Sequence, residues 1–107
     1  SFVHANARGA AELAAAAGDQ ALAAEMTATA ERIRAAVLAR LWDDETGFFY
    51  PQRARDDARA PVRELHGFFP FTVGLAPDEA RYTRALGKLV DPDEFWARFG
   101  PVITSQA

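Results

Sequence analysis

The sequence contains no cysteine, and only two of its 107 residues are histidine. Without cysteine the chain can form neither a disulfide nor a thiolate zinc site. The two histidines, His4 and His66, show none of the short His–His or His–carboxylate spacings that are typical of metal sites. We therefore expect no metal ion and no other cofactor.

Neither charge nor hydrophobicity is concentrated in one part of the chain. The formal net charge is -3, and the absence of a basic block argues against nucleic acid or an anionic membrane as a partner. No apolar run approaches the roughly 20 residues that span a bilayer. Half of the residues are hydrophobic and a quarter are charged, which is typical of a globular protein. We expect a soluble protein and favour the cytoplasm.

Helical periodicity is the clearest pattern in the first 41 residues. Residues 2–17 are rich in alanine, with Phe2 and Leu13 on the apolar stripe that we expect to be buried. The Gly-Asp pair at 18–19 is suited to end one helix and to cap the next. The second predicted helix, 20–41, has an apolar stripe of Leu22, Met26, Ala30, Ile33, Val37 and Leu41. The pattern predicts a helical hairpin.

Turn residues, aromatic residues and prolines replace this regular pattern after Leu41. The predicted elements are, in order, an acidic turn at 43–47, an extended segment at 48–50, a polar surface loop at 52–61, a short helix at 67–74, a helix at 78–90 and one further turn within 93–99. No strand of useful length appears, so the predicted class is all-α. Nearly apolar helices alternate with amphipathic ones, which predicts inner helices covered by outer helices.

Three segments resemble six-hairpin glycosidases, in the right order and at the right spacing. Leu41–Tyr50 is similar to the segment that follows an outer helix in these enzymes. Arg63–Phe71 is similar to the segment that opens the next inner helix, and Leu89–Trp96 to the one after it. The nearest group is that of the family-63 α-glucosidases and mannosylglycerate-hydrolase-like enzymes. The resemblance implies that residues 1–107 are a fragment of a single (α/α)6 barrel domain and form about two of its helical hairpins.

The same resemblance implies a glycoside hydrolase that cleaves oligosaccharides or small glycosides with two carboxylates, one acting as acid and one as base. No position here matches the family's acid or base segment, so no catalytic residue is assigned and the isolated fragment is expected to be inactive. The expected partners are a carbohydrate substrate and the remainder of the barrel. The alternatives are a non-hydrolytic sugar enzyme of the same fold, such as an epimerase or lyase, and a helical-repeat interaction module. No internal repeat at a fixed period supports the second alternative.

Five residues are candidates for contact with the substrate. Glu64 lies between apolar residues just before a predicted helix, where phenylalanines could desolvate it or Arg63 could hold it ionised. We expect Glu64 to face a sugar pocket, with Arg63 and His66 beside it. The alternative is that Glu64 pairs with Arg63 or with another residue of the barrel and only orders the loop. The family commonly has an aliphatic residue at the His66 position, so the resemblance implies no shared role there. Tyr50 and Trp96 are the rings that we expect to stack on sugar.

Overall fold

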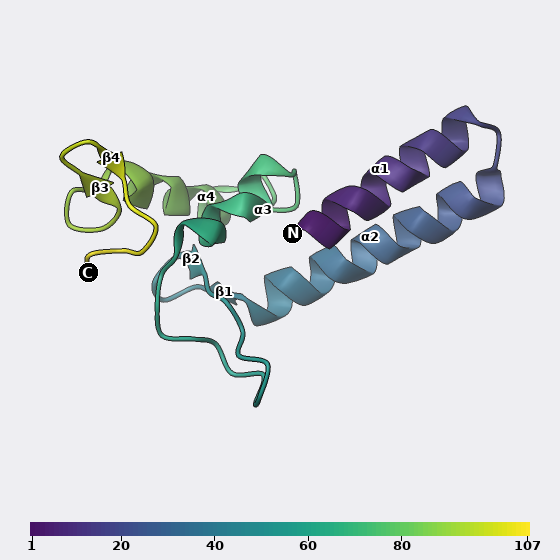
Figure 1. Cartoon of the computed structure of the whole chain (residues 1–107). Coiled ribbons are helices and arrows are strands. Elements are labelled where there is room, and N and C mark those ends of the chain that lie inside the picture. The colour runs from purple at the N-terminus through teal and green to yellow at the C-terminus, as the bar shows by residue number, and fades with distance from the viewer.

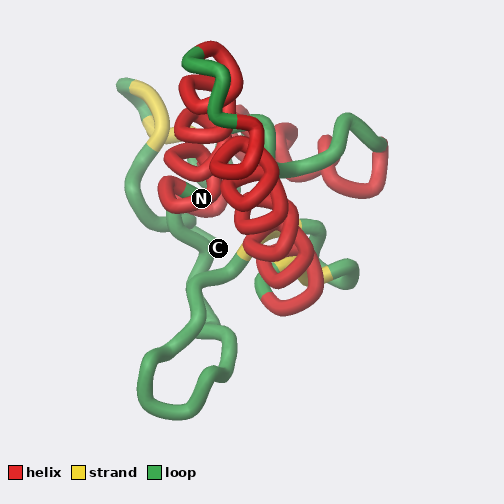
Figure 2. The backbone as a smooth tube through the Cα atoms, turned by 90° about the vertical axis from the view of Figure 1, so that its right-hand side faces the viewer, coloured by secondary structure: helices red, strands yellow, loops and turns green.

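A long helical hairpin is joined to a loop-rich part in the computed structural model, which describes residues 1–107 (Figure 1). Helices α1 (Phe2–Ala16) and α2 (Gln20–Arg40) lie side by side, as both views show (Figure 2). The molecule is elongated, with extents of 50 × 33 × 23 Å. The predicted all-α class and the predicted N-terminal hairpin are confirmed. None of the helices is long and apolar enough to cross a membrane.

The turn between α1 and α2 forms as its two central residues predict. Gly18 has a φ of +83°, a conformation that residues with a Cβ rarely adopt. Asp19 caps α2, because its Oδ1 accepts a hydrogen bond of 3.0 Å from the backbone nitrogen of Leu22. The chain therefore reverses within three residues, and α2 returns along α1.

Small side chains form the contact between the two helices. The buried face of α1 consists of His4, Ala7, Ala11 and Ala14, and α2 buries Ala23 and Ala30. The predicted stripe of α1 was wrong, because Phe2 is 64% exposed and Leu13 is 74% exposed. The alanines of α1 repeat with the same helical period as its larger apolar residues. The face that they form is the one that allows α2 to approach closely. The predicted stripe of α2 is partly buried, but Leu22 is 43% exposed.

The loop-rich part begins with a tight hairpin of two short strands. β1 (Trp42–Asp43) pairs antiparallel with β2 (Phe48–Phe49), which places Trp42 opposite Phe49. The predicted acidic turn connects them. Thr46 donates to Oδ2 of Asp43 from both its backbone nitrogen and its hydroxyl, and Gly47 has a φ of +66°. The predicted turn and extended segment are confirmed.

An aromatic core holds the loop-rich part together. Its members are Trp42, Phe48, Phe49, Phe68, Tyr82, Ala85 and Phe95. Phe48 and Phe95 are completely buried, and Phe48 packs edge-on against Phe68 with the ring centroids 5.1 Å apart. Phe68 packs in the same way against Phe95, also at 5.1 Å. These edge-to-face pairs are the arrangement that aromatic rings prefer.

Gly67 allows the backbone to lie directly against this core. A Cβ at this position would lie 2.6 Å from the carbonyl oxygen of Phe49 and closer still to the ring of Phe48. Real Cβ atoms do not approach other heavy atoms so closely. The position therefore requires glycine for steric reasons.

The predicted polar loop between residues 52 and 61 is confirmed as a loop, and it closes on itself. The backbone nitrogen of Ala60 donates to the carbonyl of Pro51 at 2.7 Å, and that of Arg53 donates to the carbonyl of Ala58 at 2.8 Å. Arg59 attaches the loop to β1 through a hydrogen bond of 2.9 Å to the carbonyl of Trp42. The loop projects from the rest of the molecule (Figure 1).

The second half of the chain contains shorter helices than the pattern predicts. The elements after the loop are η1 (Leu65–Phe68), α3 (Phe69–Thr72), α4 (Ala80–Thr83), η2 (Arg84–Val90), β3 (Trp96–Ala97) and β4 (Gly100–Pro101). The predicted helix at 67–74 corresponds to η1 and α3. The predicted helix at 78–90 begins at Ala80 and becomes a 3-10 helix at Arg84.

The turn predicted within 93–99 is confirmed, and it belongs to an antiparallel hairpin of β3 and β4 in which Trp96 pairs with Pro101. Phe95 is fixed in the aromatic core, and Gly100, with a φ of +125°, lets the chain reverse directly behind it. The anchoring of Phe95 and the conformation of Gly100 together give this turn the form of a hairpin.

Replacement of Gly67 by alanine tests the steric constraint. We expect Gly67→Ala to lower the free energy of unfolding by about 1–3 kcal/mol, because the added Cβ overpacks the core. Urea unfolding measures this loss. In the control variant Gly87→Ala the new Cβ meets nothing within 4 Å, so a change within about 0.5 kcal/mol is expected. Equal stability of both variants would contradict the close approach to Phe48.

His4 makes the hairpin sensitive to pH. Its side chain is buried between α1 and α2, and its Nδ1 has no hydrogen-bond partner. Burial, followed by the charges of Arg8 and Arg34, lowers the pKa of His4 below its ordinary value of 6.5, against the opposing charge of Glu31. The folded chain therefore resists a protonation of His4 that the unfolded chain accepts, so the contribution of His4 to stability is present above pH 6.5 and is lost as the pH falls below it.

We expect His4→Leu to remove this loss of stability. Urea unfolding at pH 7.5 and pH 5.5 should show a smaller decrease for His4→Leu than for the wild-type chain. His66→Gln, at an exposed histidine, is the matched control and should retain the wild-type decrease. An unchanged pH dependence in His4→Leu would show that His4 is not responsible.

Candidate functional site

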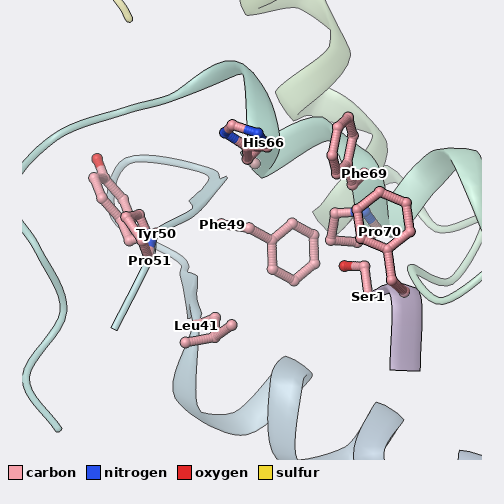
Figure 3. A pocket seen from close by; sticks show the side chains of 10 residues that line it. Ser1, Leu41, Phe49, Tyr50, Pro51, His66, Phe69 and Pro70 are labelled. Carbon is pink, nitrogen blue, oxygen red and sulfur yellow. The ribbon is translucent and has the colours of Figure 1, made fainter. Parts of the chain in front are cut away.

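A hollow of about 250 Å³ lies where the start of α1 faces β2 and the η1–α3 segment. In Figure 3, Phe49 lies at its centre, with Tyr50 on one side and His66, Phe69 and Pro70 on the other sides. The lining residues are Ser1, Phe2, Leu41, Phe49, Tyr50, Pro51, His66, Gly67, Phe69 and Pro70. Its surface is mainly apolar and carries few polar groups, as in many small-molecule sites. Two of the five predicted substrate residues, Tyr50 and His66, are in this lining.

The ring of Tyr50 lines the hollow, and its hydroxyl is engaged in two hydrogen bonds. The hydroxyl donates to Oγ1 of Thr46 at 2.9 Å and accepts from Nη1 of Arg63 at 3.3 Å. In Figure 3 it points away from Phe49. Thr46 passes the chain of hydrogen bonds on to Asp43, which lowers the pKa of that carboxyl, despite some opposing burial. The ring is therefore held in one orientation, as a stacking surface requires.

Arg63 points to the interior side of its segment and pairs with Glu94. Its Nε donates to Oε2 of Glu94 at 2.9 Å, and its side chain is 20% exposed. The hydrogen bond with Tyr50, together with the bond and charge of Glu94, raises the pKa of Arg63, against the opposing effect of burial. Arg63 is consequently a permanent cation whose Nε and Nη1 are both engaged. Arg63 and Glu64 are not paired with each other, so the alternative to a binding role is left with a pair between Glu64 and another residue.

Glu64 and His66 lie together on the opposite side of the same segment. Glu64 has an extended backbone, with φ of -115° and ψ of 154°, so its side chain is directed away from that of Arg63. Oε2 of Glu64 lies 3.8 Å from Nδ1 of His66. The two side chains are 38% and 67% exposed, and both retain free hydrogen-bonding capacity. These are the polar groups of the sequence prediction that remain available to a ligand.

Trp96 is separate from these four residues. It lies on β3, is 44% exposed and does not line the hollow. The five predicted residues therefore form two pairs and one isolated ring: Tyr50 with Arg63, Glu64 with His66, and Trp96 alone. Substrate contact by each of the five stays a prediction.

Glu94 is the residue of this region that the sequence analysis missed. It is 9% exposed and accepts hydrogen bonds from Arg63, from Nζ of Lys88 at 3.2 Å and from Oγ of Ser105 at 2.5 Å. Burial alone would raise the pKa of Glu94, but the bonds from Ser105, Arg63 and Lys88 outweigh it and lower the pKa. Glu94 stands in an acidic stretch that reads as a surface turn, and Arg63 is 31 positions away. Only its position next to the buried Phe95 indicated that it is buried.

The C-terminal segment completes the same region. Residues 63–65 lie antiparallel to residues 103–105, with a bridge between Glu64 and Thr104. The backbone nitrogen of Ser105 donates to the carbonyl of Arg63 at 2.9 Å, and that of Leu65 donates to the carbonyl of Ile103 at 2.7 Å.

No three His, Asp or Glu side chains are grouped so as to hold a metal ion. What the site offers is therefore an aromatic wall, a carboxylate and an imidazole.

Comparison with known proteins places this arrangement among the glycoside hydrolases. Residues 1–107 match the family model of the mannosylglycerate hydrolase MGH1-like glycoside hydrolase domain. The chain therefore belongs to the MGH1-like glycoside hydrolase domain family, and the predicted resemblance to six-hairpin glycosidases is confirmed.

A solved structure is also similar to the whole chain. A protein named as a sialidase superposes with a TM-score of 0.91 at 25% sequence identity. The match covers 98% of the present chain but only 10% of the sialidase chain. The 107 residues thus correspond to a small part of that much longer protein.

Proposed function

We propose that this chain is part of a glycoside hydrolase that cleaves glycosidic bonds in oligosaccharides or small glycosides. The observation that carries the proposal is the match of all 107 residues to a glycoside hydrolase domain family. The similarity to one tenth of a protein named as a sialidase supports a role as a portion of a larger enzyme. In this proposal residues 1–107 belong to a single (α/α)6 barrel domain, and the remainder of that barrel is their partner.

The geometry of the hollow supports a role in binding sugar. Sugar rings have apolar faces that stack on aromatic side chains and hydroxyl groups that need hydrogen-bond partners. Tyr50 and His66 line the hollow and supply a fixed ring and a polar group, and Glu64, which is outside the lining, lies 3.8 Å from His66 and supplies an acceptor. With about 250 Å³ the hollow suits one sugar unit rather than a long oligosaccharide.

The chemical step requires groups from outside this chain. Hydrolysis by two carboxylates needs an acid and a base on either side of the bond, about 6.5–9.5 Å apart when the mechanism is inverting. Asp43 and Glu94 are both held in ion pairs, whereas Glu64 is 38% exposed and lies 3.8 Å from His66 of the lining, where it can still accept further hydrogen bonds. In the proposed enzyme this chain binds and orients the sugar, and the acid and base come from the rest of the domain.

The whole protein and the isolated chain are expected to differ in activity. The protein that contains residues 1–107 should release free sugar from aryl glycosides or disaccharides, and the isolated chain should release none. Chromatographic and NMR analysis of the products measures both. An unsaturated or isomerised sugar from the whole protein would identify a lyase or an epimerase instead, and hydrolysis by the isolated chain would show that it contains its own acid and base.

Glu64→Gln tests whether the free carboxylate contacts the sugar. In the whole protein we expect KM to rise about tenfold, because a charge-assisted hydrogen bond to a sugar hydroxyl contributes roughly 1.5–3 kcal/mol. Steady-state kinetics measures this change. Glu45→Gln, at an exposed carboxylate without a hydrogen bond or ion pair, is the matched control and should leave KM unchanged. Wild-type kinetics in Glu64→Gln would leave Glu64 with a structural role only.

A further inference from the structure

Glu94 does not line the hollow, but its side chain binds Arg63, which in turn binds the lining residue Tyr50. Its carboxylate accepts hydrogen bonds from Arg63, from Lys88 and from the hydroxyl of Ser105. Its backbone carbonyl accepts a hydrogen bond of 2.8 Å from the nitrogen of Gln106. Since Glu94 is nearly inaccessible to solvent, it does not reach a ligand itself.

A directed series of hydrogen bonds leads from Glu94 to the ring of Tyr50. Arg63 donates to Glu94 with Nε and to the Tyr50 hydroxyl with Nη1. The Tyr50 hydroxyl can donate only one proton, and it donates that proton to Thr46. Each donor therefore has one acceptor, and the series has ionised carboxylates, Glu94 and Asp43, at its two ends.

A second connection runs through the backbone. Ser105 binds Glu94 with its hydroxyl and binds the carbonyl of Arg63 with its nitrogen. Arg63 is consequently fixed through both its side chain and its main chain. Glu64 and His66 follow Arg63 closely in the chain. The same connection therefore sets the direction in which their side chains point.

We propose that Glu94 is the positioning residue of the sugar-binding hollow, which fixes the Tyr50 ring and the 63–66 segment through Arg63 and Ser105. This inference rests on the proposed function of the hollow. It assigns to Glu94 no contact with the sugar and no part in bond cleavage. Its loss should therefore weaken substrate binding much more than the catalytic step.

Two variants separate positioning from simple support of the fold. Glu94→Gln keeps the shape of the side chain but removes the charge that holds Arg63. Lys88→Met removes the other cation from Glu94 and leaves the bond between Arg63 and Glu94 in place. In the whole protein we expect Glu94→Gln to raise KM about tenfold with kcat changed less than about twofold, and Lys88→Met to leave KM within about twofold. An unchanged KM in Glu94→Gln, or an equal rise in both variants, would overturn the proposal.

The coupling between Glu94 and Tyr50 gives a further readout that general loosening would not produce. Tyr50→Phe keeps the ring but removes the hydroxyl that Arg63 binds. In the Tyr50→Phe background, Glu94→Gln should raise KM by less than about threefold, because part of the connection is already absent. Full additivity of the two effects would contradict the connection through Arg63. Should Glu94→Gln not fold, Arg63→Gln breaks the same bond from the other side and takes its place in the series.

Hydrogen exchange without sugar distinguishes failure of this inference from failure of the proposed function. We expect amides within residues 50–66 of the whole protein to exchange faster in Glu94→Gln than in Lys88→Met. Equal exchange in the two variants would overturn the positioning role, whatever the activity. A wild-type protein that hydrolyses no glycoside would contradict the proposed function alone, and the exchange measurement would still decide the role of Glu94.

Discussion

The contact between the ring of Phe48 and the backbone of Gly67 is the constraint on which the loop-rich part depends. It joins β2 to η1 without an intervening side chain, so that Phe68 can pack against Phe48 and Phe95. Residues close to the two partners line the hollow, among them Tyr50 beyond β2 and His66 in η1. The absence of a Cβ at Gly67 thus determines where the candidate binding groups lie.

The extended backbone at residues 63 and 64 divides the site into a fixed side and an open side. Arg63 is directed inward, where its bonds to Glu94 and Tyr50 are satisfied. Glu64 is directed outward, beside His66, with capacity for further hydrogen bonds. A binding site needs both properties, because preorganised walls reduce the cost of ordering a ligand and free polar groups provide its orientation. Arg63 belongs to the preorganised wall, and the adjacent Glu64, of opposite charge, is the free polar group.

Sequence patterns predicted what local chemistry determines, and long-range contacts determined the rest. The Gly18-Asp19 turn, the hairpin of α1 and α2 and the acidic turn before β2 follow from residues close in the sequence, and all were predicted correctly. The buried side of α1 was not, because alanines and larger apolar residues both follow the helical period. Glu94 was missed because its partners Arg63 and Ser105 are 31 and 11 positions away. The family was identified from three segments in register, which local structure alone would not have shown.

The loop between Pro51 and Ala60 has its two ends joined by its own backbone hydrogen bonds. Residues can therefore be inserted or deleted at its tip without displacing either Tyr50 before it or Arg63 after it. Arg59 attaches only the base of the loop to β1, and the tip makes no hydrogen bond to any other element. Among descendants of a common ancestor, this segment is consequently a place near the hollow where length can diverge while the fold is inherited unchanged.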